Sequence, residues 1–467
     1  MSDDQRLEVA GYWWTSHTPD NRVPGVLRYL GNGKQELTTV GALRQGYEGY
    51  EGSGAATILG NCHGTPFTLP QAYFGGESRH VRTREELLQV STIETWTAFT
   101  LVRGVHLHPD SRFRTATFGL SRLSSLWYGW GLGLSSDEDL YESRSEIERP
   151  NGDRVKLVRL RSQSSGVDHR SYQDHIRFQI EADDGLTLED LDQRYIQPTK
   201  AFVASVTDEP SDSIQVQLGD FMDSALSGDN EHTTATVDPW DQGTEAHEGG
   251  LLPLIHATDS FFESVLSNWL SLSEKLISPM VISAPRRKRG FLETETFAAA
   301  GAMEQVQREF VTDLPTPFAD SVKRKLAEHA TTIGLNKEER RSIYSAVKLS
   351  ETSLQQRLER LVTSKGEAFF HKLLQGHISE WAQVTARVRN ILGHGLPYPD
   401  GSTSDYGIFL DVEHAARHVV IFRLLIECGY PEEALLSRAC EKLYWNHLLD
   451  RAHQWPKHAR SIGGRTA

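Results

Sequence analysis

The stretch FFESVLSNW, residues 261–269, marks the point at which the chain changes from one kind of structure to another. Its apolar residues lie three or four positions apart, the spacing that lines one face of a helix. Before this stretch the apolar runs are short or alternate with polar residues, which is typical of strands, and after it the helical period continues toward the end of the chain. The pattern therefore predicts an α+β protein in two parts.

The residues before 261 predict a β-rich domain with a sandwich or barrel-like fold. Short apolar or alternating runs predict strands at 23–30, 95–105, 156–160, 175–181 and 213–218. Turn signals rich in Gly, Asn, Asp and Pro stand between them at 31–33, 150–153 and 183–185. Residues 223–250 are poor in apolar side chains and rich in Asp, Thr, Gly and His, so we expect a long surface loop or linker there.

The residues after 290 predict an all-helical bundle. Five or six helices are expected, with interruptions near 315–317, 334, 393–401 and 429–431. No repeat of fixed period is visible, which favours a compact bundle over a solenoid. We therefore divide the chain into a β-rich sensor or regulatory domain at 1–222, a loop, connecting helix and basic linker at 223–290, and a helical domain at 291–467.

Composition restricts the class of protein. The chain is 38% hydrophobic and 24% charged, which is ordinary for a globular protein. No run approaches the roughly 18 apolar residues of a membrane span, and the first residues lack the pattern of a signal peptide. We therefore expect a cytoplasmic protein without a membrane partner. Because Cys62, Cys428 and Cys440 form no C-x-x-C pair, neither a zinc site nor a disulfide framework is predicted.

Charge is divided unevenly along the chain. From Arg286 onward there are 26 basic and 22 acidic residues, a net charge of +4, whereas residues 1–285 have 23 basic and 41 acidic residues, a net charge of -18. An acidic region repels nucleic acid and a basic one attracts it. Any contact with RNA is therefore expected in the C-terminal part.

A motif whose residue types could support catalysis lies near the end of a predicted helix at 377–392. We call it the RNILGH motif: Arg389-Asn390-Ile391-Leu392-Gly393-His394. We expect Gly393 to adopt the left-handed conformation that ends many helices, and the prolines at 397 and 399 to prevent continuation. His394 would then lie just beyond the helix, from where a turn can bring it back toward Arg389.

The residue types of the motif suit RNA cleavage. An arginine holds a phosphate through charge-assisted, bidentate hydrogen bonds, and a histidine can move the proton of an attacking hydroxyl at neutral pH. Two alternatives stay open at this point. An Arg and a His near a helix C-terminus are also what the helix dipole favours, and Arg387, seven residues before His394, rivals Arg389 because it shares a helical face with the histidine.

Two resemblances decide how we interpret the motif. With an amphipathic helix before it and a long helix predicted at 406–428 after it, the RNILGH motif resembles the HEPN family of helical-bundle proteins. The front of the chain resembles the ApeA N-terminal domain in Gly11-Tyr12-Trp13-Trp14 and in VPGVLRYL at 23–30. That likeness continues in ILG at 58–60 and TPFTL at 65–69, so that the two resemblances together cover most of the chain.

The resemblance implies a metal-independent endoribonuclease of anti-phage defence by abortive infection, with no cofactor. Arg389 and His394 would be its active residues, and Asn390 would support them. HEPN domains typically pair, so a homodimer through this domain is implied, with RNA, tRNA included, as the substrate. A phage-derived protein trigger at the N-terminal domain is also implied.

Other candidates are weighed against simpler explanations. The basic run Arg286, Arg287, Lys288 and Arg289 could contact RNA phosphates, although a charged linker is the commoner meaning. The aromatic pair Trp13-Trp14 and the stretch WYGWG at 127–131 could bind a partner, although such residues more often fill a core. The alternative function is a non-catalytic helical protein that dimerises and binds a partner.

Overall fold

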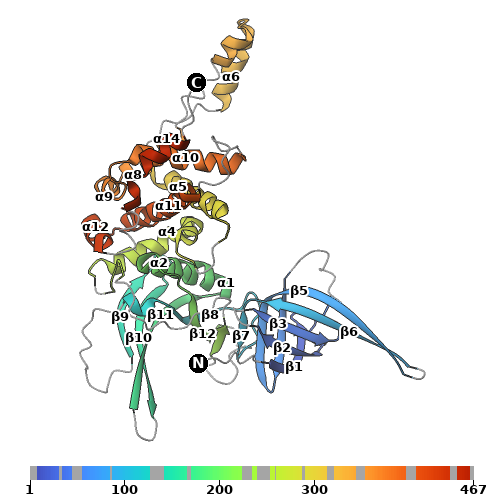
Figure 1. Cartoon of the computed structure of the whole chain (residues 1–467). Coiled ribbons are helices and arrows are strands. Elements are labelled where there is room, and N and C mark those ends of the chain that lie inside the picture. The colour runs from blue at the N-terminus through green and yellow to red at the C-terminus, as the bar shows by residue number, and fades with distance from the viewer. Residues whose placement is uncertain are drawn as a thin grey trace. The chain divides into compact units, whose positions relative to one another are not determined.

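The chain forms two compact units that divide between Glu263 and Ser264. Figure 1 shows the strands gathered in the first unit and the helices of the second. The structure, a computed structural model, describes residues 8–30, 34–44, 55–84, 87–126, 141–165, 170–222, 234–238, 253–257, 259–286, 290–312, 320–342, 353–395, 406–441 and 450–462. The two-part fold class predicted from the sequence is confirmed: a β-rich region precedes a helical one.

Six strands of the first unit close into an antiparallel barrel. They pair in the order β4, β1, β2, β3, β6, β5, and β4 pairs with β5 to complete the ring. Their bounds are β1 (Glu8–Thr15), β2 (Val23–Tyr29), β3 (Gln35–Val40), β4 (Ala56–Cys62), β5 (Thr65–Arg84) and β6 (Leu87–Ala98). The barrel-like form of the sequence prediction is therefore the one that the chain adopts.

The barrel interior is built around Trp13, which is fully buried. Its indole donates a hydrogen bond to the carbonyl oxygen of Gly25 at 3.3 Å. A Cβ at Gly60 would lie only 2.3 Å from the indole ring, so the glycine is what admits so large a side chain. Trp14 is 5% exposed. The aromatic pair therefore fills the core, which is the commoner of the two roles that the sequence allowed. The other aromatic stretch, 127–131, lies outside the described residues.

A second run of strands continues from the barrel. β7 (Leu101–Arg103) pairs with β5 and leads into the order β7, β13, β12, β8, β11, β10, β9. The bounds are β8 (Phe113–Leu120), β9 (Tyr141–Glu148), β10 (Arg154–Ser165), β11 (Arg170–Leu186), β12 (Ser213–Phe221) and β13 (Ala235–Asp238). The predicted strand runs are confirmed, because each of them falls on one or two of these elements.

Three details of the β-rich unit differ from the sequence prediction. Residues 183–185 are not a turn, because β11 runs through them with a shift of register in which Gly185 has a φ of 70°. The expected loop at 223–250 contains β13, which pairs with β12 and β7. A helical segment was also missed: α1 (Leu188–Leu191), η2 (Asp192–Ile196) and α2 (Gln197–Thr207). Most of α2 is buried, so it lacks the polar face that reveals a helix in a sequence.

The second unit begins within α4 (Phe262–Ser283), where the opening stretch of apolar residues is confirmed as a helix. Leu276 has a non-helical φ of -120°, three residues before Pro279, and the helix is kinked there because proline cannot donate the backbone hydrogen bond. The other helices are α5 (Leu292–Phe310), α6 (Asp320–Thr332), α8 (Leu354–Thr363), α9 (Glu367–Leu373), α10 (Ile378–His394), α11 (Tyr406–Glu427), α12 (Glu432–Glu441) and α14 (Trp455–Ile462).

The number of helices after residue 290 exceeds the five or six that were predicted, because the described residues alone contain eight labelled ones from α5 onward. Short connections explain the difference. α8 and α9 are separated by a turn at Gly366, whose φ of 78° is left-handed, and the sequence pattern merged such short helices into longer ones. The predicted helix at 406–428 is confirmed as α11.

α11 is the central helix of the bundle, since residues on all its sides are buried. α5 packs against both α11 and α10, and α14 packs against α10. Arg423 of α11 shows how the interior is satisfied: it donates hydrogen bonds to the carbonyl oxygens of Leu361 and Lys365 at the end of α8. Burial lowers the pKa of this guanidinium below its ordinary value. α10 packs against α8 as well as against α5 and α14, and its other side is exposed.

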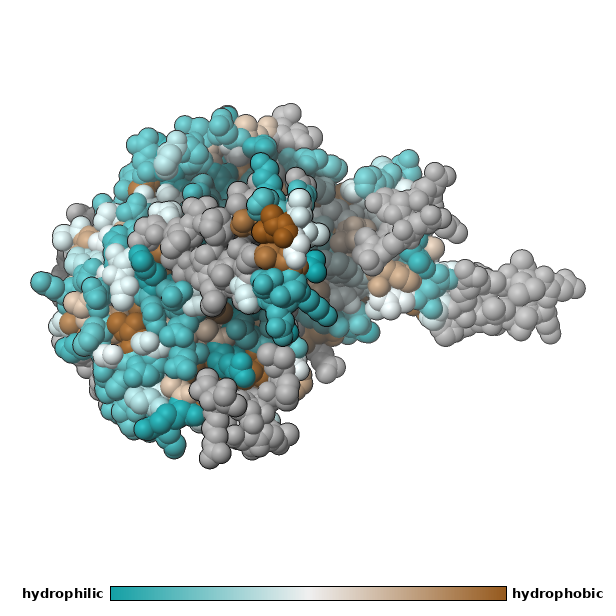
Figure 2. Space-filling view, turned by 90° about the horizontal axis from the view of Figure 1, so that it is seen from above, coloured by the Kyte–Doolittle hydropathy of each residue, from teal (hydrophilic) through white to brown (hydrophobic). Residues whose placement is uncertain are grey.

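The surface and the cysteines add two observations. The face in Figure 2 is mostly hydrophilic, with small separate hydrophobic spots. Across the described ranges, none of the helices has both the length and the apolar character required to cross a bilayer. Cys62 and Cys428 are buried free thiols, and burial raises the pKa of Cys62 to about 11 and that of Cys428 still further. Neither is suited to act as a nucleophile near neutral pH.

Candidate functional site

The RNILGH motif occupies the last two turns of α10. A core-facing stripe holds this helix in place: Trp381, Val384, Val388 and Ile391 are buried. Their spacing of three and four residues turns one side of the helix inward and leaves the other to solvent. The motif is therefore presented on a helix whose position is fixed by packing.

The helix ends two residues later than predicted. α10 continues through His394, and Gly395 is the residue in the left-handed conformation, with a φ of 60°. The prediction that Gly393 ends the helix is therefore wrong. Gly393 keeps its place in the helix because its missing side chain leaves room for Phe297: a Cβ there would lie 3.0 Å from the phenyl ring. The predicted stop signals, the prolines at 397 and 399, lie outside the described residues.

Arg389 is held by two residues of α5. Its Nε donates to Oε1 of Glu304 at 2.6 Å, and the Glu304 side chain is only 8% exposed. Its guanidinium carbon lies 5.7 Å from the ring centroid of Phe297, within the range of a cation–π contact. Arg308 lies 3.5 Å from the other oxygen of Glu304. The Arg389 side chain stays 27% exposed, so the guanidinium is fixed at one edge and open at another.

A different face of α10 carries His394. The residue is exposed, as is Arg387, and Asn390 is half-buried. Successive residues of a helix are about 100° apart, so Asn390 and Arg387 lie within about 40° of His394, whereas Arg389 lies about 140° away. The structure thus brings His394, Asn390 and Arg387 to one face and turns Arg389 toward α5. Within a single copy of the chain, the motif does not form one compact cluster.

The basic run before α5 is described only at its first residue. Nε and Nη2 of Arg286 both donate to the carbonyl oxygen of Val281, at 3.2 and 3.0 Å. Burial lowers the pKa of Arg286 below its ordinary value. These bonds commit two of its donors to the end of α4. Arg287, Lys288 and Arg289 lie outside the described residues, so the prediction that this run binds phosphate stays a prediction.

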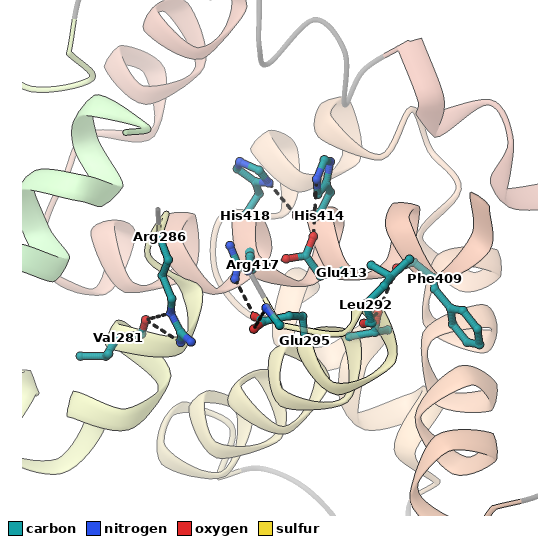
Figure 3. Close-up of polar contacts among 11 residues, drawn as sticks. Val281, Arg286, Leu292, Glu295, Phe409, Glu413, His414, Arg417 and His418 are labelled. Atoms are coloured by element: carbon teal, nitrogen blue, oxygen red, sulfur yellow. Dashed lines mark hydrogen bonds and ion pairs between the residues drawn. The ribbon is translucent and has the colours of Figure 1, made fainter. Parts of the chain in front are cut away.

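A buried ionic cluster joins α5 to α11 (Figure 3). Arg417 lies 3.1 Å from Glu295 and 2.7 Å from Glu413, and the side chains of Arg417 and Glu413 are 6% and 1% exposed. Glu413 is also 3.4 Å from His414. The backbone N–H of Gly290 donates to Glu295 at 3.1 Å, which connects the basic run to the same cluster. Because the charges are enclosed and paired with one another, the cluster holds the two helices together.

A second buried carboxylate anchors the C-terminal helix. Asp411 of α11 accepts a hydrogen bond from Nε2 of His458 at 2.8 Å, and Arg451 donates to both of its oxygens. Burial alone would raise the pKa of Asp411, but the bonds from His458 and Arg451 outweigh it and hold the pKa below its ordinary value. His458 belongs to α14, which packs on α10, so this contact supports the helix that carries the motif.

Comparison with known proteins identifies the front of the chain. Residues 8–234 match the model of the family described as ApeA N-terminal domain 1. The first unit thus contains an ApeA N-terminal domain. The family points to anti-phage defence. No curated protein and no solved structure matches the chain.

The ApeA N-terminal domain covers the barrel and most of the second run of strands, since its match begins with β1 and ends just before β13. The residues that resemble this domain in the sequence belong to its core: Gly11, Gly25 and Gly60 line the barrel around Trp13 and Cys62. These three glycines are therefore explained by packing. The RNILGH motif lies outside the matched residues.

Sequence reasoning missed Glu304 and Phe297. They lie more than eighty positions before the motif, and they share one face of α5 because they are seven residues apart. An acidic residue and an aromatic residue at this spacing in a helix are common, so the sequence alone gave them no functional meaning. Only the packing of α5 against α10 shows that both contact Arg389.

Proposed function

We propose that the helical unit of this protein is a metal-independent HEPN endoribonuclease of abortive infection, which cleaves RNA, tRNA included. The observation that carries the proposal is that one helix end presents both an exposed His394 and, on another face, an arginine that is fixed in advance. A mobile arginine would have to be ordered when substrate binds, whereas Glu304 already holds Arg389 through its Nε. The other guanidinium nitrogens stay available for a phosphate.

The reaction that these residues can support is an internal transesterification. The 2′-hydroxyl of a ribose attacks the adjoining phosphorus, a new P–O2′ bond forms, and the P–O5′ bond breaks. The proton of the 2′-hydroxyl passes to a base, and an acid returns a proton to the 5′ oxygen as it leaves. The products are a 2′,3′-cyclic phosphate and a 5′-hydroxyl, and the substrate itself supplies the nucleophile.

Each residue has a stated role in this proposal. His394 transfers the proton, and Arg389 stabilises the charge that develops on the phosphate. Glu304 is a positioning residue, because it acts on the phosphate only through Arg389. Asn390, half-buried and one turn before His394, supports the polar face. Arg387 shares that face and is the auxiliary cation.

A homodimer would complete the site. A base and an acid are both needed, and the motif offers one histidine per chain. The separation of about 140° between Arg389 and His394 on α10 also supports a composite site, because an arginine of one copy can then face a histidine of the other. We propose that two copies of α10 approach each other across a two-fold axis.

The alternative function is a helical protein that dimerises and binds a partner without catalysis. The ion pair between Arg389 and Glu304 favours it, since an arginine already paired inside a protein is what a structural role requires. The two functions differ in what happens to RNA. The alternative also predicts that a His394→Ala variant protects cells from phage as well as the parent protein does.

A cleavage assay separates the two functions. The purified protein is incubated with tRNA and mRNA in EDTA, with and without phage lysate as activator, and the new RNA ends are identified. We expect 2′,3′-cyclic phosphate ends, and no cleavage of RNA in which the ribose at the cut site carries a 2′-O-methyl group. RNA that stays intact under every condition contradicts the proposed activity and favours the alternative.

We propose further that a phage-derived protein triggers the nuclease by binding the ApeA N-terminal domain. Large apolar side chains exposed on the barrel support this: Tyr12 of β1 is 60% exposed, Val40 of β3 is 52% and Tyr73 of β5 is 42%. Phages that escape defence should then carry changes in one protein that binds the parent chain but not a Tyr12→Ser, Tyr73→Ser variant. Escape changes confined to phage RNA would contradict a protein trigger.

A further inference from the structure

Phe297 is an exposed aromatic ring beside the RNILGH motif. Its side chain is 42% exposed, whereas Phe369, Phe370 and Phe422 of the same unit are 2% exposed or less. The ring contributes little to the core, yet it lies in contact with a residue of the motif. An exposed ring in that position is suited to a ligand.

Contacts with α10 fix the ring. A Cβ on Gly393 would come within 3.0 Å of ring carbon Cε2, so the ring edge lies directly against the backbone of the motif. The Arg389 guanidinium lies over the ring at 5.7 Å from its centroid, and Glu304 holds that guanidinium in turn. A ring held in this way binds a flat ligand with little loss of side-chain freedom.

The helix beside Phe297 leaves space for such a ligand. One turn further along α5 stands Gly301, and a Cβ built there would meet nothing within 4 Å. The residues four positions before and after Phe297 are Glu293 and Gly301, and Ala300, three positions after it, is buried. Among these helical neighbours the ring is thus the exposed apolar group, and the charged side chains of Glu293 and Arg389 lie beside it.

These surroundings favour a nucleobase over a protein partner. Protein interfaces centre on contiguous apolar patches with few charges. Stacking of a base requires one ring face only, and a cation close by can hold the phosphate of the same strand. Arg389 is that cation, and Arg308, whose side chain is 67% exposed, lies 3.5 Å from the same Glu304. We propose that Phe297 is a base platform, on which an unpaired nucleobase of the RNA stacks next to the phosphate held by Arg389.

The base platform rests on the proposed ribonuclease function and adds the class of substrate. A base within a duplex is already stacked on its neighbours, so the platform selects RNA with unpaired nucleotides, such as a loop. The experiment uses the full chain with His394→Ala, which we expect to bind RNA without cleaving it. Binding of a fluorescein-labelled RNA hairpin and of a blunt duplex of equal length is followed by anisotropy.

We expect the hairpin to bind more tightly than the duplex, and Phe297→Leu to weaken hairpin binding about tenfold while duplex binding stays unchanged. Phe297→Tyr should bind as the parent does, because it keeps the ring. Thermal unfolding by circular dichroism checks that both variants are folded. Single bases are then removed from the loop one at a time. When the stacked base is removed, the parent and the Phe297→Leu variant should bind the hairpin with equal affinity.

The outcomes separate the two proposals. Equal hairpin binding by the Phe297→Leu variant and the parent, or no binding by either, overturns the base platform. A Phe297→Leu variant that becomes monomeric in light scattering, with unchanged RNA affinity per chain, assigns the ring to a protein contact and overturns the platform also. If the binding pattern is as expected but the parent chain never cleaves RNA, the platform stands and the proposed catalysis fails. If RNA is cleaved and Phe297→Leu leaves both cleavage and hairpin binding unchanged, the proposed catalysis stands and the base platform fails.

Discussion

Two arginines of the helical unit are each held by a glutamate of α5, and they differ in how much of the side chain stays exposed to solvent. Arg417 is 6% exposed, lies between Glu295 and Glu413, and is enclosed by helices. Arg389 is 27% exposed and is bonded to Glu304 through Nε. The same pairing of residue types thus forms an internal brace in one place and a surface group in the other.

The difference teaches that a paired arginine is not thereby excluded from function. A guanidinium has five N–H donors in a fixed fork, and a partner at Nε orients the fork without occupying the edge that matches a phosphate. Enclosure, and not pairing, makes Arg417 structural. The predictions below test this distinction between an enclosed arginine and an oriented one.

The largest effect is expected from His394→Ala, at the exposed end of α10 that also carries Arg389. Removal of the proton-transferring group should lower the rate of RNA cleavage about 10³-fold and abolish phage protection. Single-turnover cleavage of a labelled RNA measures the rate. The matched control is His377→Ala, which replaces the same residue type at the other end of α10. Parental cleavage by the His394→Ala protein would falsify the assignment.

The next largest effect is expected on stability, from Arg417→Met at the enclosed arginine. The substitution leaves Glu295 and Glu413 without their buried cation, and breaking such a pair costs about 3 kcal/mol of stability. Arg389→Met should cost less, about 1 kcal/mol, because Arg389 is partly exposed and Arg308 still lies 3.5 Å from Glu304. Urea unfolding followed by tryptophan fluorescence compares the two. Equal losses would remove the distinction between the two arginines.

A comparison of Arg389→Ala with Arg387→Ala identifies the arginine that contacts the phosphate. Loss of the oriented guanidinium should lower cleavage about 100-fold, whereas loss of the freely exposed one should lower it only a few-fold. The measurement is kcat/KM on the same RNA, with unfolding curves recorded in parallel. If Arg387→Ala has the larger effect, the arginine on the face of His394 is the catalytic one, and the role of Glu304 loses its basis.

A smaller effect is expected from Glu304→Gln, which keeps the shape but removes the charge that orients Arg389. We expect kcat to fall about tenfold with little change of KM, because the phosphate still meets a guanidinium but in a less fixed position. Glu309→Gln on the same helix is the control, since Glu309 pairs with Lys275 and not with the motif. A rise in kcat would show instead that Glu304 restrains Arg389 from acting.

The smallest effect concerns pH and the carboxylate Asp411. Its pKa is lowered in the folded chain by His458 and Arg451, so the stability it contributes is present above the ordinary pKa of about 4 and is lost as the pH falls through the lowered value. Between about pH 5 and pH 3 the parent protein should therefore lose more stability than Asp411→Asn, which has no such group to protonate. Parallel curves of unfolding free energy against pH would contradict the assignment.

The sequence predicted elements better than it predicted contacts. Periodicity revealed α10 and α11 because each has a spacing that packing requires, and alternation revealed the strands. It placed the helix end at Gly393 because a glycine often ends a helix, but here that glycine admits the ring of Phe297, and Gly395 ends the helix. It did not find Glu304, because the contact between α5 and α10 joins positions 85 residues apart.

Closure of the barrel through the pairing of β4 with β5 has a consequence for how this domain can evolve. A sheet with a free edge invites a partner to add a strand, and recognition then depends on backbone geometry that few substitutions can alter. A closed ring of strands presents side chains instead. If a phage protein binds there, as we propose, the residues that face outward, such as Tyr12 and Tyr73, can be exchanged as that protein changes, while the hydrogen bonds between the strands stay as they are.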